Sequence, residues 1–331
     1  MPEAALHSVV APAFNEAEGL ARFHERCAAA LVALGEPYEL LYVDDGSRDG
    51  TWDVMRELAA HDPHVRLVRL SRNFGHQVAI TAGLDAASGD TVTVIDTDLQ
   101  DPPEVIGELV ARWRAGADVV FAVRTARPGE SGFKRTTAAG FYRLLRWLAD
   151  VDMPLDAGDF RLLSRRAVDA LRAMPERDRY VRGMVAWIGY ETATVEYDRE
   201  PRVAGETKYP LRRMVRFGLD GVVGFSMRPL RIATWLGLLV SLVAFVLAIG
   251  LIIARLAGGI PVQGWTSLAV LILLVGGVQL VTVGALGEYV GRVYNEVRAR
   301  PLYLVRETVG PADRQRSTAD DLTSAPRSAP H

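Results

Sequence analysis

Short apolar runs alternate with helix-like segments over the first part of the chain. The runs are bounded by polar or turn residues, as buried strands are, and they cover residues 7–14, 38–45, 65–71, 91–98 and 118–125. The segments between them favour helices, and they cover residues 15–34, 46–62, 75–88 and 102–116. This alternation predicts an α/β domain with a mostly parallel sheet.

Two longer apolar segments follow near the other end of the chain. Residues 232–254 and 266–287 contain no charged side chain, and each segment is long enough to cross a hydrocarbon core of about 30 Å. Two buried helices of a soluble protein are a weaker interpretation, because a soluble helix normally has a polar face. The sequence therefore predicts two transmembrane helices.

The charges around these segments predict their orientation. Residues 208–231 and 292–306 are rich in basic side chains, whereas the connecting loop, 255–265, contains Arg255 as its one charged residue. Basic flanks of membrane helices stay on the cytoplasmic side. We therefore expect the N-terminal region and the tail to lie in the cytoplasm, at the inner membrane of the cell.

These predictions divide the chain into three parts. A cytoplasmic domain covers 1–230, the two membrane helices lie in 231–290, and a polar tail covers 291–331 and is expected to be disordered after about residue 307. Two further segments mix basic residues with aromatic and aliphatic ones, and we expect them to form amphipathic helices at the bilayer surface, at about 132–150 and 208–226.

Composition excludes several other classes. The net charge of −2 argues against a bulk nucleic-acid binder. A single cysteine, Cys27, excludes an internal disulfide framework and multi-cysteine metal sites, which indicates a reducing compartment. We interpret Cys27 as a small buried hydrophobe. The N-terminus lacks a basic stretch followed by a long apolar core, so we expect no secretory signal there.

The stretch TVTVIDTDLQDPP, residues 91–103, places acids directly after an apolar strand. If strand geometry continues that far, Asp96 and Asp98 present both carboxylates to one point. Two adjacent carboxylates repel unless a cation lies between them, and their oxygens suit Mg²⁺ or Mn²⁺, which could bridge a diphosphate. Gln100 can add a neutral oxygen ligand. Asp101, before Pro102, is placed to cap the following helix.

Polar residues also end the neighbouring strands. Asp44 and Asp45 follow the second strand and could accept hydrogen bonds from a ribose or a base, with Gly46 permitting a tight turn. Asn15 and Glu16 end the first strand. Neither G-x-G-x-x-G after the first strand nor G-x-x-x-x-G-K-[ST] anywhere is present, so the phosphate loops of dinucleotide and P-loop sites are missing. The remaining interpretation is a nucleotide that is bound by acidic residues, with its phosphates bound through a metal ion.

Several motifs together carry a family resemblance. The stretches VVAPAFNEAEGL, YVDDGSRDGT, VIDTDLQDPPEVI, GDFRLLSRRAVDAL and ETKYPLRRMVRFGLDGVVGFS resemble the polyprenyl-phosphate glycosyltransferases of glycosyltransferase family two. That group includes dolichol-phosphate mannose synthase and bacterial undecaprenyl-phosphate glucosyltransferases with two C-terminal membrane helices. The resemblance implies a GT-A fold, a nucleotide-diphosphate sugar donor, a divalent metal, a polyprenyl phosphate acceptor and, as an expectation, a homo-oligomer.

The resemblance also implies roles for individual residues. The metal site would consist of Asp96, Asp98 and Gln100. Residues around the nucleotide sugar would be Pro12, Phe14, Glu16, Asp45, Gln77 and Thr97. Cations for phosphate groups, including that of the acceptor, would be Arg124, Lys134, Arg135 and Lys208. For Lys134 and Arg135, ordinary membrane-surface charge is an equal alternative.

Asp159 matches the aspartate proposed as the catalytic base of that family. A phosphate monoester has a second pKa near 6, so an acceptor phosphate is largely a dianion at about pH 7 and scarcely needs deprotonation. Asp159 could therefore orient the acceptor or a neighbouring arginine instead, and helix capping is a further alternative. Asp98 is expected to be catalytic through the metal.

These observations lead to one hypothesis and several rivals. We expect an inverting, metal-dependent transfer of a sugar from UDP-glucose to undecaprenyl phosphate at the cytoplasmic membrane face. GDP-mannose is an alternative donor. A processive polysaccharide synthase would need Q-x-x-R-W, and RLLRW at 143–147 lacks the glutamine. A transporter would need ionisable residues inside its spans. A non-catalytic membrane scaffold that binds a nucleotide sugar is the remaining alternative.

Overall fold

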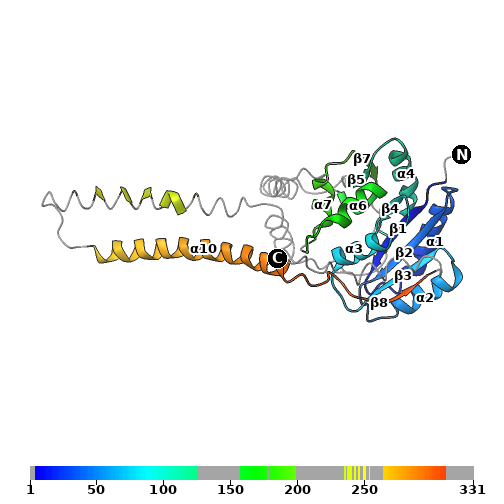
Figure 1. Cartoon of the computed structure of the whole chain (residues 1–331), viewed down its shortest axis with the longest axis horizontal. Coiled ribbons are helices and arrows are strands. Elements are labelled where there is room, and N and C mark those ends of the chain that lie inside the picture. Colours follow the sequence, from blue (N-terminus) through cyan, green and yellow to red (C-terminus); the bar gives the residue numbers. More distant parts are fainter. Residues whose placement is uncertain are drawn as a thin grey trace, which may run out of the picture. The chain divides into compact units, whose positions relative to one another are not determined.

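The computed structural model describes residues 4–125, 157–177, 179–198 and 264–310, with isolated positions between 235 and 253. Figure 1 shows the elements formed by these residues. They belong to two compact units: an α/β unit, which also takes in residues 301–310, and a second unit that contains the long helix α10.

The α/β unit is built on one sheet. Its strands are β1 (His7–Ala13), β2 (Tyr38–Asp44), β3 (Val65–Leu70), β4 (Thr91–Val94), β5 (Val119–Arg124), β6 (Ala157–Ser164), β7 (Thr192–Tyr197) and β8 (Val305–Val309). They lie side by side in the order β7-β5-β6-β4-β1-β2-β3-β8, which makes the sheet 8-stranded. The five strands predicted from the sequence are all present.

Parallel pairing dominates the centre of the sheet. The pairs β1–β2, β1–β4, β2–β3 and β5–β7 are parallel, and at the middle Val9 lies opposite Leu40 on one side and Thr93 on the other. β6 is antiparallel to both β4 and β5, and β8 is antiparallel to β3. The predicted α/β fold with a mostly parallel sheet is therefore confirmed, with antiparallel strands that the sequence analysis did not predict.

Helices follow most of the strands, as the alternating pattern predicted. They are α1 (Leu20–Val32), α2 (Thr51–His61), α3 (His76–Ala86), a short 3-10 turn η1 (Pro103–Val105) that leads into α4 (Ile106–Arg114), α6 (Arg165–Ala173) and α7 (Val181–Trp187). In Figure 1, α3 lies near the middle of the α/β unit, beside the labels of the central strands. The chain segments between strands thus form the helical layers that cover the sheet.

α1 illustrates how the sequence builds the core. Its buried residues, Leu20, Phe23, Cys27 and Leu31, recur at three- and four-residue spacing and form one stripe along the helix. They pack with Val9, Leu40 and other sheet residues in one cluster. Each fully buried side chain of this size contributes about 1.5–3 kcal/mol to folding. Burial also raises the pKa of the Cys27 thiol, which confirms that this cysteine is a core residue.

α10 (Trp265–Val297) is the long helix of the second unit. Residues Leu274–Val297 are long and apolar enough to cross a membrane, with a mean hydropathy of 1.3, and side chains such as Ile272, Leu280 and Val283 are exposed. The helix includes the predicted span 266–287. Of the predicted first span, the structure describes separate positions between 235 and 253, and the amphipathic segments at about 132–150 and 208–226 lie wholly outside the described residues, so these remain predictions.

After α10 the chain joins the sheet. β8 lies along β3 with Thr308 opposite Val68 and Glu307 opposite Arg69, and the backbone N–H of Ser71 donates to the Leu304 carbonyl at 2.8 Å. No strand was predicted here, where disorder was expected to begin at about residue 307. The sheet thus contains an edge strand from the far end of the chain.

Candidate active site

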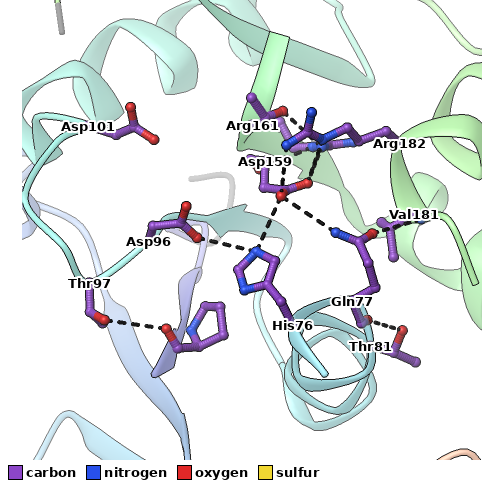
Figure 2. A network of polar contacts seen from close by, with 12 residues as sticks. His76, Gln77, Thr81, Asp96, Thr97, Asp101, Asp159, Arg161, Val181 and Arg182 are labelled. Atoms are coloured by element: carbon purple, nitrogen blue, oxygen red, sulfur yellow. Dashed lines mark hydrogen bonds and ion pairs between the residues drawn. The ribbon is translucent and has the colours of Figure 1, made fainter. Parts of the chain in front are cut away.

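The candidate site lies where β1, β2 and β4 end at the same edge of the sheet. Ligands of open α/β sheets bind beyond the carboxyl ends of the strands. Figure 2 shows side chains from three segments converging there: the residues after β4, the start of α3, and β6 with α7. The geometry of each segment decides which predicted residues meet.

The strand before the acids is shorter than predicted. β4 ends at Val94, and Leu99 has a φ of 57°, so Asp96 and Asp98 lie in a loop and not on one face of a strand. The expectation that strand geometry would align the two carboxylates was therefore wrong. They nevertheless lie two positions apart in the same loop. The loop, rather than the strand, positions them.

Asp96 is an incompletely satisfied carboxylate. Its Oδ1 is enclosed and makes no hydrogen bond with the part of the chain that the structure describes, although His76 Nε2 is 3.4 Å away as an ion pair. The side chain as a whole is 31% exposed, so its other atoms remain accessible. Burial, followed by the negative charges of Asp159, Asp101 and Asp98, raises the pKa of Asp96 to about 6. This carboxylate is suited to a positively charged ligand.

Asp96 and Asp98 supply two carboxylates for a divalent metal. Asp98 Oδ1 accepts the backbone N–H of Gln100 at 3.1 Å, so both residues belong to one turn. Over the described ranges, no group of three or more His, Cys, Asp or Glu side chains is placed to hold a metal. Mg²⁺ is commonly held by one or two carboxylates, with water and substrate phosphates completing its shell. Asp96 and Asp98 fit that arrangement.

Asp45 organises a neighbouring loop. Its Oδ1 accepts the backbone N–H of Phe74 at 2.7 Å and its Oδ2 accepts that of Gly75 at 2.9 Å, which fixes the turn that leads into α3. Gly46 has a φ of 70°, and a Cβ there would lie 2.4 Å from the Arg72 carbonyl carbon. Only glycine fits that turn without a shift. Asp45 thus holds the segment that presents His76.

The other residues expected around a nucleotide gather at the end of β1. Thr97 Oγ1 donates to the Pro12 carbonyl at 3.4 Å, and both belong to the same edge of the sheet. Phe14 is 41% exposed directly beyond β1. The backbone N–H of Glu16 donates to Thr51 Oγ1 at 2.9 Å, which ties this loop to α2. An exposed aromatic ring beside backbone and hydroxyl groups is a surface suited to a base.

Asp159 lies at the centre of the second half of the site. Arg182 donates to it in a bidentate pair, Nε to Oδ1 at 2.9 Å and Nη2 to Oδ2 at 3.0 Å, and Arg161 Nη2 reaches Oδ1 at 3.0 Å (Figure 2). His76 Nε2 lies 3.2 Å from Oδ2. Burial by itself would raise the pKa of Asp159, but the His76 and Arg182 contacts hold this pKa well below its ordinary value. Helix capping, one of its expected alternatives, is not its role here.

Gln77 connects the two halves. Its Oε1 accepts the backbone N–H of Val181 at 3.0 Å, at the start of α7, and its Nε2 donates to Asp159 Oδ2 at 3.5 Å. Figure 2 shows the side chain between α3 and the Asp159 cluster. Gln77 therefore fixes the start of α7, and with it Arg182, against the start of α3.

Asp101 has partners that the sequence did not predict. It is 1% exposed, accepts a hydrogen bond from the Tyr197 hydroxyl and pairs with Arg124 Nη2 at 3.5 Å. The assigned N-cap residues of η1 and α4 are Pro102 and Val105, and capping by Asp101 stays a prediction. Arg124 lies at the end of β5 and 30% of its side chain is exposed. Lys134, Arg135 and Lys208 lie outside the described residues.

Three residues of the site had no predicted role. His76, Arg161 and Arg182 all contact Asp159, yet the sequence analysis singled out none of them. The available signal was Arg161 itself, a charge inside the apolar run of β6, where a buried arginine needs a partner. His76 follows the end of a predicted strand, where ligands bind.

Comparisons with known proteins agree with this picture. A family model described as Glycosyl transferase family 2 matches residues 8–172. The uncharacterized glycosyltransferase YkcC of Bacillus subtilis is 45% identical over 304 residues, which are 92% of this chain and 94% of that protein. The bactoprenol glucosyl transferase of Shigella phage SfII is 42% identical over 301 residues, 91% of this chain and 97% of its own length. A solved mannosyltransferase of Pyrobaculum calidifontis is 18% identical, with a TM-score of 0.47, and covers 90% of this chain and 88% of its own.

Proposed function

Because this chain belongs to glycosyltransferase family 2, we propose that it transfers a sugar from a nucleotide-diphosphate sugar to a polyprenyl phosphate. Relatives named bactoprenol glucosyl transferase, which match over most of both chains, support a polyprenyl acceptor and a glucosyl donor. UDP-glucose and undecaprenyl phosphate are the substrates that we propose first. The identities of the sugar, the nucleotide base and the metal ion are all part of this proposal.

The observation that carries the proposal is the pair of acids after β4. Asp96 has an enclosed oxygen without a hydrogen-bond partner among the described residues, and Asp98 lies in the same loop. Mg²⁺ or Mn²⁺ held by these two carboxylates would stabilise the negative charge that develops on the departing nucleoside diphosphate. Gln100, in the same turn, is the neutral residue beside them.

The remaining residues bind and orient the substrates in this proposal. The exposed ring of Phe14 offers a stacking surface for the base, and Pro12, Glu16 and Thr97 complete the proposed nucleotide-sugar site. Asp45 holds the turn before α3, and Gln77 fixes the start of α7. Arg124 is the proposed cation for a phosphate on the β5 side, and Lys134, Arg135 and Lys208 complete that set as proposals. An acceptor phosphate that attacks the anomeric carbon in line gives inversion.

The membrane parts support an acceptor that arrives from the bilayer. The apolar stretch Leu274–Val297 of α10 and the basic residues in 208–231 and 292–306 favour a membrane-bound enzyme with its catalytic domain in the cytoplasm. We propose the inner membrane as its location, with two spans. A homo-oligomer is part of the same proposal.

A direct assay tests the function. The full chain, purified in detergent, is mixed with undecaprenyl phosphate and a panel of UDP- and GDP-sugars, and both nucleotide release and the lipid-linked sugar are measured. We expect turnover with UDP-glucose, its loss in EDTA, and its recovery on adding Mg²⁺ or Mn²⁺. Asp98→Asn should lower kcat by more than about 100-fold, because a ligand to the metal is lost.

Each alternative gives a different result. A GDP-mannose-dependent enzyme transfers from GDP-mannose and not from UDP-glucose. A scaffold binds a nucleotide sugar without releasing nucleotide when the lipid is added. Full metal-dependent transfer by Asp98→Asn would contradict the role of the acids.

A further inference from the structure

Two arginines share one carboxylate in the Asp159 cluster. Asp159 Oδ1 accepts from Arg161 Nη2 at 3.0 Å and from Arg182 Nε at 2.9 Å, and Oδ2 accepts from Arg182 Nη2 at 3.0 Å. Arg161 also donates through Nη2 to the Gly158 carbonyl at 3.0 Å. The two guanidinium groups therefore lie close to each other with one acid between them.

The acceptor capacity of Asp159 is filled. A carboxylate offers about four lone-pair sites. Besides the arginine contacts, His76 Nε2 lies 3.2 Å and Gln77 Nε2 3.5 Å from Oδ2. Asp159 is 6% exposed. A proton acceptor needs an accessible lone pair directed at the reacting group, and these five contacts leave Asp159 without one.

The positive charge of the cluster is not balanced by Asp159. Arg161 is 1% exposed, and its Nη1 is enclosed and has no hydrogen-bond partner among the residues that the structure describes. Burial lowers the pKa of Arg161 to about 10, so it stays charged at neutral pH. The carboxylate of Asp96 also acts on Arg161, and this carboxylate is itself paired with His76. An unpaired buried donor costs free energy, which an anion close to the guanidinium would offset.

Arg182 has the geometry to bind such an anion. It uses Nε and Nη2 for Asp159, while Nη1 makes no hydrogen bond with the described residues, and 32% of the side chain is exposed. A guanidinium held on one edge by a carboxylate keeps its remaining donors in a fixed direction. Arginine suits phosphate oxygens because its planar donors match them.

We propose that Arg182, supported by Arg161, binds a phosphoryl group of a substrate, and that Asp159 is a positioning residue that holds Arg182. The ligand class is a phosphate monoester or a nucleoside diphosphate. That this group belongs to the sugar donor or to the lipid acceptor rests on the proposed function. No proton moves to Asp159 in this arrangement.

Phosphate binding can be measured without turnover. Thermal unfolding of the full chain in detergent is followed with inorganic phosphate and with pyrophosphate, in EDTA so that no metal links the anion to Asp96 and Asp98. A ligand that binds the folded state raises Tm. We expect both anions to raise the Tm of the wild type and of Arg166→Gln, a control on a surface arginine 64% exposed, but not that of Arg182→Gln. An equal rise in all three proteins would overturn the proposal.

A double-mutant cycle separates positioning from proton transfer. Asp159→Asn, Arg182→Gln and the double variant are compared in sugar transfer. We expect each single variant to raise KM for one substrate by about tenfold or more, and the double variant to be no worse than the poorer single one, because both remove one interaction. A rise in donor KM identifies the diphosphate, and a rise in acceptor KM identifies the lipid phosphate.

If Asp159 acted as the catalytic base, the same variants would give different results. If Asp159 were the base, Asp159→Asn would abolish kcat whatever stands at position 182, remove the acid limb of the pH profile, and multiply with Arg182→Gln. Arg182→Lys keeps the charge but loses the bidentate pair, so it should recover part of the anion effect. If the wild type binds phosphate through Arg182 yet transfers no sugar, the proposed function fails and this proposal stands.

Discussion

Glu39, on β2, is a buried carboxylate whose hydrogen bonds come from three separate parts of the domain. It accepts from the Ser8 hydroxyl at 2.6 Å, from Arg66 Nη1 at 2.7 Å and from the Ser88 backbone N–H at 2.7 Å. Burial by itself would raise the pKa of Glu39, but these donors outweigh it and hold the pKa below its ordinary value. The ionised form therefore stabilises the fold.

This makes part of the stability dependent on pH. Because the pKa of Glu39 is lower in the folded than in the unfolded chain, its contribution is present above about pH 4.3 and is lost as pH falls through the folded pKa. We expect Glu39→Gln to lower the free energy of unfolding by about 1–3 kcal/mol at neutral pH and to lose less than the wild type on acidification to about pH 3. Denaturant unfolding at several pH values measures this, with exposed Glu57→Gln as the control. Identical pH profiles for Glu39→Gln and wild type would contradict it.

Residue roles in the site were predictable only where a motif marks them. The acids Asp96 and Asp98 stand out because they follow an apolar run. Arg182 does not, because its partner Asp159 is 23 positions away and the pair forms only when β6 and α7 come together. The contacts of Asp101 with Tyr197 and Arg124 were not predicted for the same reason, since these partners are distant in sequence. Local patterns carry no information about such contacts.

The elements differ in how far local pattern determines them. β1 to β5 and α1 to α4 were predicted because each carries its own apolar period and its own turn residues. In β6 the apolar residues are interrupted by Arg161, and the sequence of β8 is VRETV. Neither sequence has the apolar pattern that is typical of a buried strand. β8 pairs with β3 across more than two hundred positions of sequence. Such pairing depends on the edge of the sheet and not on the strand alone.

α3 is held at both ends. Its start carries His76 and Gln77 into the site, and its last turn is bound by Arg172, whose Nη2 donates to the Leu84 carbonyl at 2.6 Å. Asp85 Oδ2, in the same turn, accepts from the Tyr303 hydroxyl at 2.8 Å. The segment after α10 therefore contacts both β3 and α3, the two elements that flank the turn before His76.

Removing the Tyr303 hydroxyl tests how much its hydrogen bond to Asp85 contributes to stability. We expect Tyr303→Phe to lower the free energy of unfolding by about 1–3 kcal/mol, because the half-buried Asp85 carboxylate loses a donor. Thermal unfolding of the full chain in detergent measures the effect. Tyr294→Phe, on an exposed position of α10, is the matched control and should leave the stability unchanged. Equal stability of both variants would mean that the hydroxyl contributes nothing.

The whole molecule joins an enzyme domain to an apolar helix. The exposed side chains of α10 include Leu268, Leu280 and Val283, which suits a hydrocarbon environment. We expect the full chain to sediment with membranes, to resist about 1 M salt and alkaline carbonate, and to be released by detergent. Salt screens charge but does not weaken apolar insertion. Release by salt alone would indicate attachment through basic residues and would contradict a span.

The position of β8 in the chain has a consequence for biosynthesis. Chains emerge from the ribosome N-terminus first, and domains begin to fold as they emerge. The strand that completes the sheet, Val305–Val309, is made after α10, so the edge of β3 stays unpaired until translation has passed the apolar helix. A nascent chain that stalls within α10 therefore carries an open strand edge, the kind of edge that pairs with other chains. Synthesis of the apolar helix and completion of the sheet are thereby ordered in time, with the helix first and the finished sheet last.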